Sequence, residues 1–281
     1  MFIDTTYKDC TVCGASTTER LRFPHFTVRS CARCGHEFTT DLAPGARESY
    51  DSDYFQIKHA NWVNNPDTAI HDDIARIIAS HFGKNAAVID IGCGQGDFLK
   101  HLAGCGFTNL TGLDIIDQDQ GDFRYLKTPV EAFDSSETFD AIVSLANIEH
   151  INDVRDYMRR LANRLAPGGL LVIYTVDNGS LLYRASKALF SMGITFAARR
   201  LYDPHHVNHF SVRSLAILAA SQGLKGERLT RRNMPMSAVT LAKTPLAPAV
   251  YGAIRVIDLV STAFGKQMLQ LALFTRYTLQ G

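Results

Sequence analysis

The chain has 281 residues, of which 46% are hydrophobic and 20% are charged, and its formal net charge is +1. These values are ordinary for a globular protein, and the balanced charge gives no electrostatic footprint for nucleic acid as the main partner. The first ten residues lack the apolar core of a secretion signal, and the most apolar segments, 181–198 and 246–264, are interrupted by charged side chains. We therefore expect a cytoplasmic protein.

Four of the six cysteines form two paired motifs near the N-terminus. Cys10 and Cys13 make one C-x-x-C pair, Cys31 and Cys34 make another, and a glycine follows each pair. Two such knuckles match a tetrahedral zinc site with four thiolate ligands, whereas a reducing compartment argues against disulfides. Redox pairs and unligated thiols are the alternatives. Four bound thiolates leave no open position, so we predict a structural zinc in a ribbon spanning residues 1–45.

The following part of the chain alternates helices with strands. Asn65 and Pro66 predict the start of a helix that ends at Gly83 and carries isoleucines on one face. The buried run AAVIDIG then predicts a strand, and apolar residues from Phe98 to Ala103 predict a second helix.

Four more strands and one long helix complete this alternating region. The helix runs from Val154 to Leu165, and Pro167-Gly168-Gly169 is expected to end it. The predicted strands cover residues 109–115, 123–126, 138–145 and 170–176. Strands that alternate with helices indicate right-handed crossovers and a doubly wound, parallel sheet.

A glycine-rich loop follows the first of these strands. In doubly wound sheets the ligand lies beyond the carboxyl ends of the strands. Gly92, Gly94 and Gly96 occupy such a position, and their backbone amides suit a polar or anionic group. Asp114 ends the next strand, where a carboxylate can accept both hydroxyls of a ribose. The pattern predicts a cofactor that contains adenosine.

The spacing of the glycines bears on which adenosine cofactor is bound. A dinucleotide site has the pattern G-x-G-x-x-G, but here Asp97 occupies the place of the third glycine. The glycines here follow the pattern G-x-G-x-G instead. This difference from the dinucleotide pattern is the one expected for a site that binds S-adenosylmethionine, which has no pyrophosphate. Asp90, just before the loop, can address the ammonium group of that cofactor while the loop amides meet its carboxylate.

Four stretches, in this order and spacing, resemble the motifs of class I S-adenosylmethionine-dependent methyltransferases. They are VIDIGCGQGDFL, LTGLDI, FDAIVSLANIEHINDV and LAPGGLLVIYTVDN, within residues 65–178. The resemblance implies a Rossmann-like methyltransferase fold, an α/β doubly wound and mostly parallel seven-stranded sheet with an antiparallel edge. Its last two strands would be LKGERLTRR and QMLQLALFTRY.

The flanking sequences sharpen this resemblance. CTVCG and CARCGHEFTT, followed by YDSDYF and later by DPHHVNHFSVRSLAILAASQGLK, resemble a subgroup with an N-terminal zinc ribbon of four cysteines. Members of that subgroup are often associated with modification of sugars in polysaccharide or natural-product assembly. This association is an analogy, because a fold does not fix the substrate.

The resemblance also implies which residues contact the cofactor. The loop glycines would line its methionine end with Asp90 nearby, and Asp114 would hold the ribose. Pro129 stands where the family often has an acid that reads the adenine, so the neighbouring Val130 and Glu131 take that place here. The predicted cofactor-binding residues are Asp90, Gly92, Gly94, Gly96, Asp114, Val130, Glu131 and Leu145.

Transfer of a methyl group to a hydroxyl needs a general base, and histidine titrates in the right range. His206 fits the H-x-x-x-F-S stretch of the subgroup, just before a helix that is predicted from Ser211 to Gly223. We take His206 as the candidate base. The alternative is that this histidine and its neighbours order the loop by hydrogen bonds, for example to Asp203.

Three further residues are candidates for catalysis. His209 belongs to the same cluster as His206, and Glu149 and His150 follow the fourth strand at a helix entrance. For Glu149 and His150, capping and loop ordering are the stronger alternative to a catalytic role.

The remaining part of the chain is placed in one large methyltransferase domain, residues 46–281, with a helical cap insertion at about 179–210. Its apolar and basic faces fit a cap over the acceptor pocket. Contact with a lipid-linked acceptor or a membrane surface is the alternative, and we favour the cap.

The sequence as a whole predicts transfer of a methyl group from S-adenosylmethionine to a small molecule. We expect the acceptor to be a hydroxyl of a sugar or sugar nucleotide. One alternative is an RNA methyltransferase whose ribbon binds RNA, although the net charge argues against it. The other is a non-catalytic, cofactor-binding assembly protein.

Overall fold

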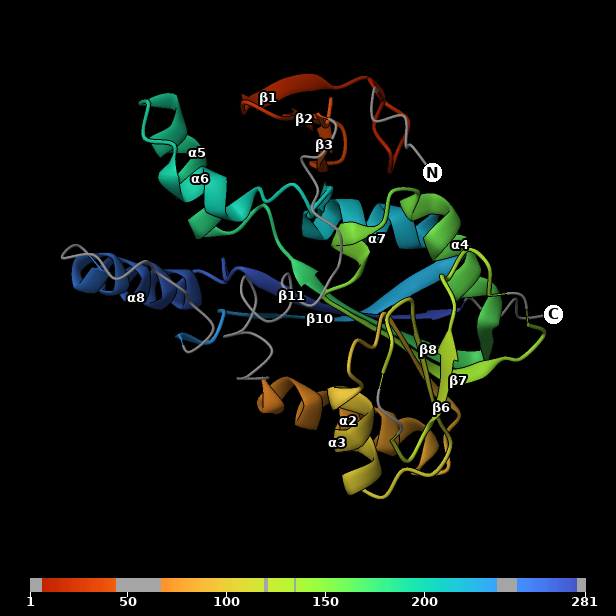
Figure 1. The fold of residues 1–281 in the computed structure, drawn as a ribbon. Helices are drawn as coiled ribbons and strands as arrows, with labels where there is room; N and C mark the ends of the chain where they lie inside the picture. Colours follow the sequence, from red (N-terminus) through yellow and green to blue (C-terminus); the bar gives the residue numbers. More distant parts are fainter. Residues whose placement is uncertain (1–6, 44–66, 119–120, 134, 237–246, 277–281) are drawn as a thin grey trace. The chain divides into compact units, whose positions relative to one another are not determined.

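The computed structural model describes residues 7–43, 67–118, 121–133, 135–236 and 247–276. The chain divides into two compact units, each assembled from separate stretches (Figure 1). The first unit contains residues 1–66, 176–214 and 230–270, and the second contains 67–175, 215–229 and 271–281.

The second unit is built on a seven-stranded sheet with the order β10-β11-β8-β7-β4-β5-β6. Its central strands pair in parallel, β8 with β7, β7 with β4, β4 with β5 and β5 with β6. The doubly wound, mostly parallel methyltransferase fold is therefore confirmed. The strands are β4 (Val88–Ile91), β5 (Leu110–Asp114), β6 (Arg124–Lys127), β7 (Phe139–Leu145), β8 (Leu165–Val176), β10 (Leu224–Arg232) and β11 (Leu269–Arg276).

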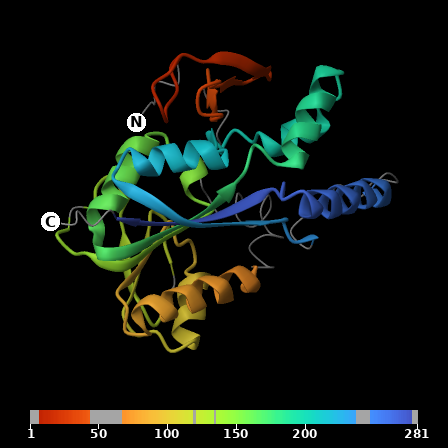
Figure 2. The ribbon, with the colours of Figure 1, turned by 180° about the vertical axis from the view of Figure 1, so that it is seen from behind.

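Helices cover both faces of this sheet. In the two opposite views, α2 and α3 lie on one side of it, and α4 and α7 lie on the other (Figures 1 and 2). The core lies between these layers, and every side chain of β4 is buried. A strand buried on both faces explains why its sequence, Asp90 apart, is apolar. The helices are α2 (Thr68–Phe82), α3 (Asp97–Gly104), α4 (Val154–Arg164) and α7 (Val212–Ala220).

The start of α2 differs from the sequence prediction. The helix begins at Thr68, because the carboxylate of Asp67 accepts a hydrogen bond from the backbone N–H of Ile70 and so caps its first turn. The predicted start at Asn65 and Pro66 lies outside the described residues. The end is as predicted, since Gly83 follows the helix with a φ of 75°.

The boundary between α4 and β8 is a second correction. The predicted strand began at residue 170, after Pro167-Gly168-Gly169, whereas β8 begins at Leu165. Leu165 leaves the helix in an extended conformation and pairs with Phe139 of β7. The helix therefore ends through strand pairing, before the proline and glycines are reached.

The first unit contains a four-stranded antiparallel sheet with the order β1-β2-β3-β9. Glu37 and Phe38 of β3 pair with His209 and Asn208 of β9, so the N-terminal segment shares a sheet with a strand near residue 208. The elements of this unit are β1 (Thr18–Arg22), β2 (Thr27–Ser30), β3 (Glu37–Thr40), α5 (Leu181–Ser191), α6 (Phe196–Leu201), β9 (Asn208–His209) and α8 (Ala247–Ala263).

Aromatic side chains pack the N-terminal strands of the first unit against α5 and α6. The ring of Phe23 lies 4.6 Å from that of Phe26, 5.3 Å from that of Phe190 and 6.3 Å from that of Tyr202. Stacked and tilted contacts of this kind add to the free energy gained by burying apolar area. The predicted ribbon and the predicted helical insertion are thus parts of one packed body.

Within the part of the chain that the structure describes, no helix combines the length and the apolar character needed to cross a bilayer.

Candidate functional site

The glycine loop after β4 is held in a left-handed backbone conformation. Gly92, Gly94 and Gly96 have φ values of 75°, 54° and 75°. A Cβ atom at Gly92 would overlap the side chain of Asn147, and one at Gly96 would overlap the ring of Phe123. At Gly94 no atom lies within 4 Å of the position that a Cβ would take. Two of the glycines are therefore required by close packing as well as by φ, and the third borders open space.

Asp114, at the end of β5, is hydrogen-bonded to this loop. Its Oδ2 accepts a hydrogen bond from the backbone N–H of Gly94 at 2.8 Å, and its Oδ1 accepts one from that of Ile115 at 2.7 Å. Oδ1 also accepts a hydrogen bond from the backbone N–H of Ile116 at 3.3 Å. A carboxylate has about four lone-pair sites, so Oδ2 retains the capacity to accept from a ligand hydroxyl. The side chain of Ile115, which the sequence analysis did not single out, is 54% exposed beside this carboxylate.

Asp90 is buried under the loop with an incomplete set of hydrogen bonds. Its side chain is 2% exposed, and its Oδ1 has no hydrogen-bond partner among the described residues. Burial, together with the charge of Asp114, raises the pKa of Asp90 to about 8. A cation placed at this oxygen would favour the ionised carboxylate and complete its bonding. This is the chemistry expected of an ammonium partner.

Asn147 is a site residue that the sequence analysis missed. Ala146, at the end of β7, has a φ of 47°, a conformation that non-glycine residues adopt infrequently. The Asn147 Nδ2 that follows it donates hydrogen bonds to the carbonyl oxygen of Ile91 and to the hydroxyl of Tyr157. Because an amide after a strand has no distinctive sequence pattern, only the packing against Gly92 reveals its role.

Tyr157 extends this network into α4. The Tyr157 hydroxyl lies 2.8 Å from the Ser144 Oγ and 3.0 Å from the Asn147 Nδ2. Burial raises the pKa of Tyr157, so the hydroxyl stays neutral and can both donate and accept. The ring of Tyr157 is buried with the apolar side chains of α4, and its hydroxyl belongs to this network.

Glu149 and His150 form most of a short 3-10 helix, η2 (Ile148–His150). Glu149 is 2% exposed, and its Oε2 accepts a hydrogen bond from the Thr175 Oγ1 at 2.7 Å. Burial raises the pKa of Glu149 to about 7. The side chain is thus engaged with β8, as the loop-ordering alternative expects, and His150 is half-buried.

The predicted adenine neighbours differ in exposure. Val130 is buried at 7% exposure, Glu131 is exposed, and Leu145 is half-buried at the end of β7, where it pairs with Tyr174 of β8. Ile115 and Leu145 both lie at strand ends of the parallel sheet, where ligands of such folds bind.

The two candidate histidines of the first unit have different surroundings. His209 is fully buried, and its Nδ1 lies 3.1 Å from the hydroxyl of Tyr183. Burial, followed by the nearby charge of His206, lowers the pKa of His209 well below its usual value, so this imidazole is neutral. His206 is half-buried, and its backbone N–H donates to the carbonyl oxygen of Asp203.

Asp203 accepts hydrogen bonds from the backbone amides of this segment. Its Oδ1 accepts a hydrogen bond from the backbone N–H of His205 at 2.8 Å, and its carbonyl oxygen accepts the one from His206. Both bonds come from backbone amides, so the alternative in which the histidine side chains order the loop by bonding to Asp203 stays a prediction.

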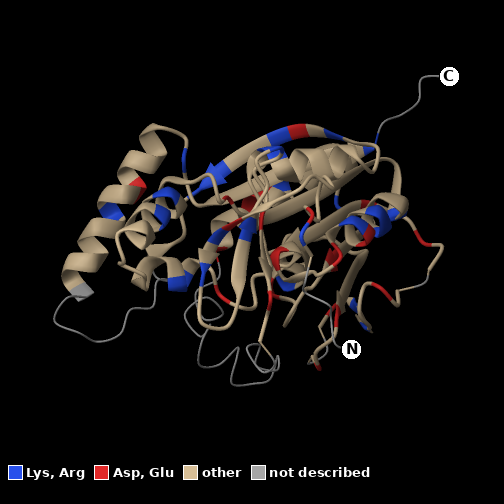
Figure 3. Ribbon diagram, turned by 90° about the horizontal axis from the view of Figure 1, so that it is seen from above, with Lys and Arg blue, Asp and Glu red and all other residues tan. Residues whose placement is uncertain are grey.

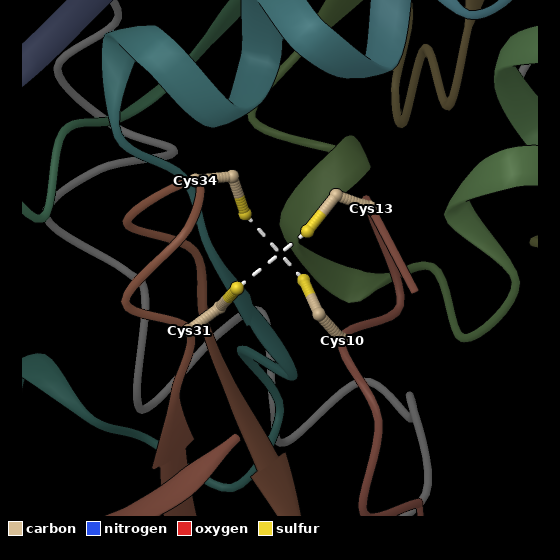
Figure 4. A group of neighbouring side chains, drawn as sticks. All are labelled: Cys10, Cys13, Cys31 and Cys34. Carbon is tan, nitrogen blue, oxygen red and sulfur yellow. Dashed lines mark hydrogen bonds between the residues drawn. The ribbon is translucent and has the colours of Figure 1, made fainter. Parts of the chain in front are cut away.

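The four paired cysteines meet at one point. The sulfur atoms of Cys10, Cys13, Cys31 and Cys34 lie within 4.8 Å of one another and point toward a common centre (Figure 4). The Cys10 and Cys34 sulfurs are 3.5 Å apart, as are those of Cys13 and Cys31. Four thiolates in this arrangement fit a tetrahedral ion that prefers sulfur, and zinc is the common one.

The second knuckle of the cluster is hydrogen-bonded to segments from the middle of the chain. The Ser211 Oγ donates to the carbonyl oxygen of Cys34 at 3.1 Å, and the Asn178 Nδ2 donates to that of Gly35 at 2.9 Å. Ser211 also exchanges hydrogen bonds with Ser214 at the start of α7, as an N-cap does. The four-cysteine cluster is thus hydrogen-bonded to residues that flank the histidine segment.

The chain resembles known methyltransferases over its central part. A family described as "Methyltransferase domain" matches residues 63–229, which is more than half of the chain. A ubiquinone biosynthesis O-methyltransferase of Rickettsia bellii is 27% identical over 119 residues, covering 38% of this chain and 49% of the relative. One of Rhizobium leguminosarum is 32% identical over 117 residues, covering 37% and 45%. The chain thus spans about half the length of these curated relatives.

Solved structures share the fold at low sequence identity. The plantazolicin methyltransferase BpumL aligns with a TM-score of 0.54 and 14% identity, covering 81% of this chain and 92% of that one. The 1,6-didemethyltoxoflavin-N1-methyltransferase of Burkholderia thailandensis, solved with S-adenosylhomocysteine, aligns with a TM-score of 0.50 and 13% identity, covering 92% and 99%. With the family match over more than half of its length, and with the sheet order of that fold, the chain belongs to the family described as "Methyltransferase domain".

Proposed function

We propose that this protein methylates a hydroxyl of a small molecule, a sugar or a sugar nucleotide, with His206 as the general base. The observation that carries the cofactor part is the buried Asp90 carboxyl group, whose Oδ1 has no partner among the described residues. Two observations support the acceptor class. The curated relatives are named as O-methyltransferases, and the four-cysteine ribbon resembles that of sugar-modifying members.

The residues around the loop have distinct proposed roles in holding the cofactor. Asp90 would pair with the ammonium group, and the cofactor's carboxylate would lie in the open space beside Gly94, whose own N–H is bonded to Asp114. Asp114 would accept from the ribose hydroxyls through Oδ2, which has the lone pair that its three amide contacts leave. Ile115, which is exposed, and Leu145, which is half-buried, would pack on the adenine with Val130 and Glu131.

The chain's own part in the reaction would be to position the acceptor, exclude water and take one proton. The bound cofactor supplies an electrophilic methyl group on a sulfonium, so the protein need not generate an electrophile. His206 would remove the proton of the acceptor hydroxyl as the oxygen attacks. The residues of the 179–210 segment would close over the acceptor as a cap.

Site-directed replacement of His206 tests this function. We expect His206→Ala to bind S-adenosylhomocysteine as the parent does in calorimetry, and to lose about two orders of magnitude or more in turnover. Turnover is measured as methyl incorporation into a pool of sugar nucleotides, read by mass spectrometry. His81→Ala, at an exposed position on α2, is the matched control and should keep full activity.

Two results would overturn the proposal. Equal turnover in His206→Ala and in the parent would remove the assignment of the base. Incorporation into RNA, with none in the small-molecule pool, would replace the acceptor class.

We also propose that the four-cysteine cluster holds a structural zinc. All four ligands come from the chain, so no position would be left for a substrate. Metal analysis of the purified protein should find zinc in an equimolar amount and should find it lost in Cys34→Ser. Cys105→Ser, at a half-buried cysteine outside the cluster, should retain it.

A further inference from the structure

The turn between α5 and α6 exposes three large apolar side chains. Met192 is 74% exposed, Ile194 is 50% exposed and Phe196 is 56% exposed. Single exposed apolar residues are common on soluble proteins and need no explanation. Three within five residues, at the tip of a helical hairpin, make a contiguous patch of the kind that marks a contact surface.

A second set lies on α8, which packs against α5 in the same unit. Val256, Leu259, Val260 and Phe264 are 59%, 73%, 39% and 74% exposed. Their spacing of three and four residues places them on one face of the helix. The start of α5 and the end of α8 are also joined by a backbone hydrogen bond, from the N–H of Leu181 to the carbonyl oxygen of Lys266 at 2.9 Å.

The charged side chains of α5 and α6 are basic. Residues 178–202 contain four basic side chains and no aspartate or glutamate, although the whole chain has a net charge of only +1. Arg184 and Arg199 are exposed there, and Arg255 is exposed on α8. Figure 3 marks the Lys and Arg positions of the chain in blue and its Asp and Glu positions in red. The acid of α8, Asp258, is half-buried. Lys187 is paired with Glu37, so the exposed charged groups on these elements are arginines.

We propose that these exposed side chains of residues 184–199 and 255–264 form a surface that rests on an anionic lipid membrane. The apolar side chains would enter the boundary between headgroups and acyl chains, and the guanidinium groups of Arg184, Arg199 and Arg255 would pair with lipid phosphates. This is the arrangement of an interfacial contact, in which an element lies on a bilayer without crossing it.

Charge complementarity favours an anionic membrane over a second copy of the chain, and the kind of exposed side chain favours it over a single-stranded nucleic acid. In an interface between two copies, two-fold symmetry would bring this cationic surface against itself, and like charges would repel. A single-stranded nucleic acid is bound by cations that alternate with aromatic stacking platforms. Here the exposed side chains are mostly aliphatic, with Phe196 and Phe264 as the aromatic members. An anionic bilayer matches both the apolar and the cationic parts.

Co-sedimentation of the full chain with vesicles tests the proposal. We expect binding to vesicles that contain phosphatidylglycerol, little binding to pure phosphatidylcholine vesicles, and weaker binding as salt is raised. Arg184→Glu with Arg199→Glu should lower the partition coefficient by about fivefold or more for each cation. The triple variant Met192→Ser, Ile194→Ser, Phe196→Ser should lower it by about tenfold or more.

Matched variants outside the surface separate this effect from general changes in the chain. Leu229→Ser removes an exposed apolar side chain of β10, and Arg213→Glu reverses an exposed charge of α7. Both should bind vesicles as the parent does. Hydrogen exchange in residues 9–40 and 178–211 serves as the folding control for every variant, because the proposed surface belongs to the same unit as these residues.

Three outcomes would overturn the proposal. They are absence of binding to both kinds of vesicle, equal binding to both kinds, and a loss in the control variants as large as that in the triple variant. If the triple variant instead changes the sedimentation mass and leaves vesicle binding intact, the surface is an interface between copies. Because the readout is lipid binding without any acceptor, it is independent of the proposed sugar methylation.

Discussion

At the scale of single residues, the acidic side chains of the site differ in their hydrogen bonds. Two of them accept hydrogen bonds from other residues of the chain, and the third has an oxygen without a partner among the described residues. Asp114 accepts hydrogen bonds from the backbone of the glycine loop, and Glu149 accepts one from Thr175. Asp90 is as deeply buried as Glu149 and lacks a partner for one oxygen among the described residues. Burying an unpaired charge costs several kcal/mol, so the unliganded chain keeps the Asp90 carboxyl group protonated up to about pH 8.

Asp90 should therefore couple cofactor binding to proton release. Its pKa of about 8 lies above the ordinary value of 3.8, so folding takes up a proton, and this group makes the unliganded protein less stable as the pH rises from about 4 to about 8. When an ammonium group binds and the carboxylate ionises, about one proton should leave at pH 7. Calorimetry of S-adenosylhomocysteine binding, in two buffers with different ionisation enthalpies, measures it.

Asp90→Asn provides the comparison. It should bind the ligand with equal heats in both buffers, and more weakly by about 2–5 kcal/mol, because the ammonium loses its charged partner. Equal heats for the parent protein would mean that Asp90 does not titrate on binding.

Gly94 and Gly96 allow strain and ligand contact to be separated. Both have positive φ, but a Cβ at Gly94 meets no atom within 4 Å, whereas one at Gly96 overlaps Phe123. We expect Gly96→Ala to lower the free energy of unfolding by about 2–4 kcal/mol, the sum of backbone strain and overpacking. Gly94→Ala should lower it by only about 1–2 kcal/mol from strain and should still weaken ligand binding. Urea denaturation and calorimetry give the two quantities, and equal stability losses would contradict the packing argument.

At the scale of elements, a buried ion pair joins the N-terminal strands to the helices of the first unit. The Nζ of Lys187 on α5 lies 2.8 Å from the Oε1 of Glu37 on β3, and their side chains are 13% and 6% exposed. The hydroxyl of Tyr202, after α6, donates to the Oε2 of Glu37 at 2.5 Å. Both carboxylate oxygens of Glu37 are thus occupied, one by a cation and one by a hydroxyl.

Breaking this pair from one side should destabilise the protein more than removing both partners. Glu37→Gln leaves the Lys187 ammonium buried without its counter-ion, and we expect a loss of about 3–5 kcal/mol in the free energy of unfolding. Glu37→Gln with Lys187→Met should be less destabilised than Glu37→Gln alone, since no charge is left buried. A double-mutant cycle in urea measures the coupling, and additive losses would show that the two side chains do not interact.

Much of the alternating region could be predicted from the sequence, because its signals are local. The apolar run of β4, the isoleucine face of α2 and the glycines of the loop are each set by neighbouring residues. The start of β8 at Leu165 could not be predicted, because it depends on pairing with Phe139 of another strand. The pairing of β3 with β9 could not be predicted either, because β9 has only two residues and such a short strand carries no periodic signal.

The candidate site follows the same division. Asp90, Asp114 and the glycines could be identified because they occupy fixed positions at strand ends. Asn147 could not, because its contact with Gly92 depends on the positive φ of Ala146 and on the Tyr157 hydroxyl of another helix. Non-local packing of this kind is not encoded in any short pattern.

At the scale of the whole molecule, neither compact unit is a continuous piece of chain. The chain passes between them after residues 66, 175, 214, 229 and 270. The proposed zinc lies in the first unit with the β9 strand and His206, and the glycine loop lies in the second unit. Each ligand should therefore protect its own unit, and hydrogen exchange can follow the two separately.

Removal of the metal and addition of the cofactor product should give different exchange patterns. Zinc binding holds four thiolates together, and the Cys34 and Gly35 carbonyl oxygens accept from Ser211 and Asn178. Chelation should therefore speed amide exchange in residues 9–40 and, through these two hydrogen bonds, in 178 and 207–211. S-adenosylhomocysteine should slow exchange in residues 90–97 and 113–116, where the loop amides bond to the end of β5. Mass spectrometry of peptides from the intact chain resolves these segments.

Ser211→Ala tests whether the metal centre orders the histidine segment through the bonds described. It removes the donor to Cys34 and the cap of α7, so exchange at 207–211 should rise by about tenfold even with zinc bound, for a loss of about 1–2 kcal/mol. Ser191→Ala, at an exposed serine that ends α5, is the matched control and should leave that segment as in the parent. If chelation speeds exchange in residues 9–40 and leaves 207–211 unchanged, the metal stabilises only its own knuckles. The histidine segment is then held by the β3–β9 pairing and by the Glu37 network.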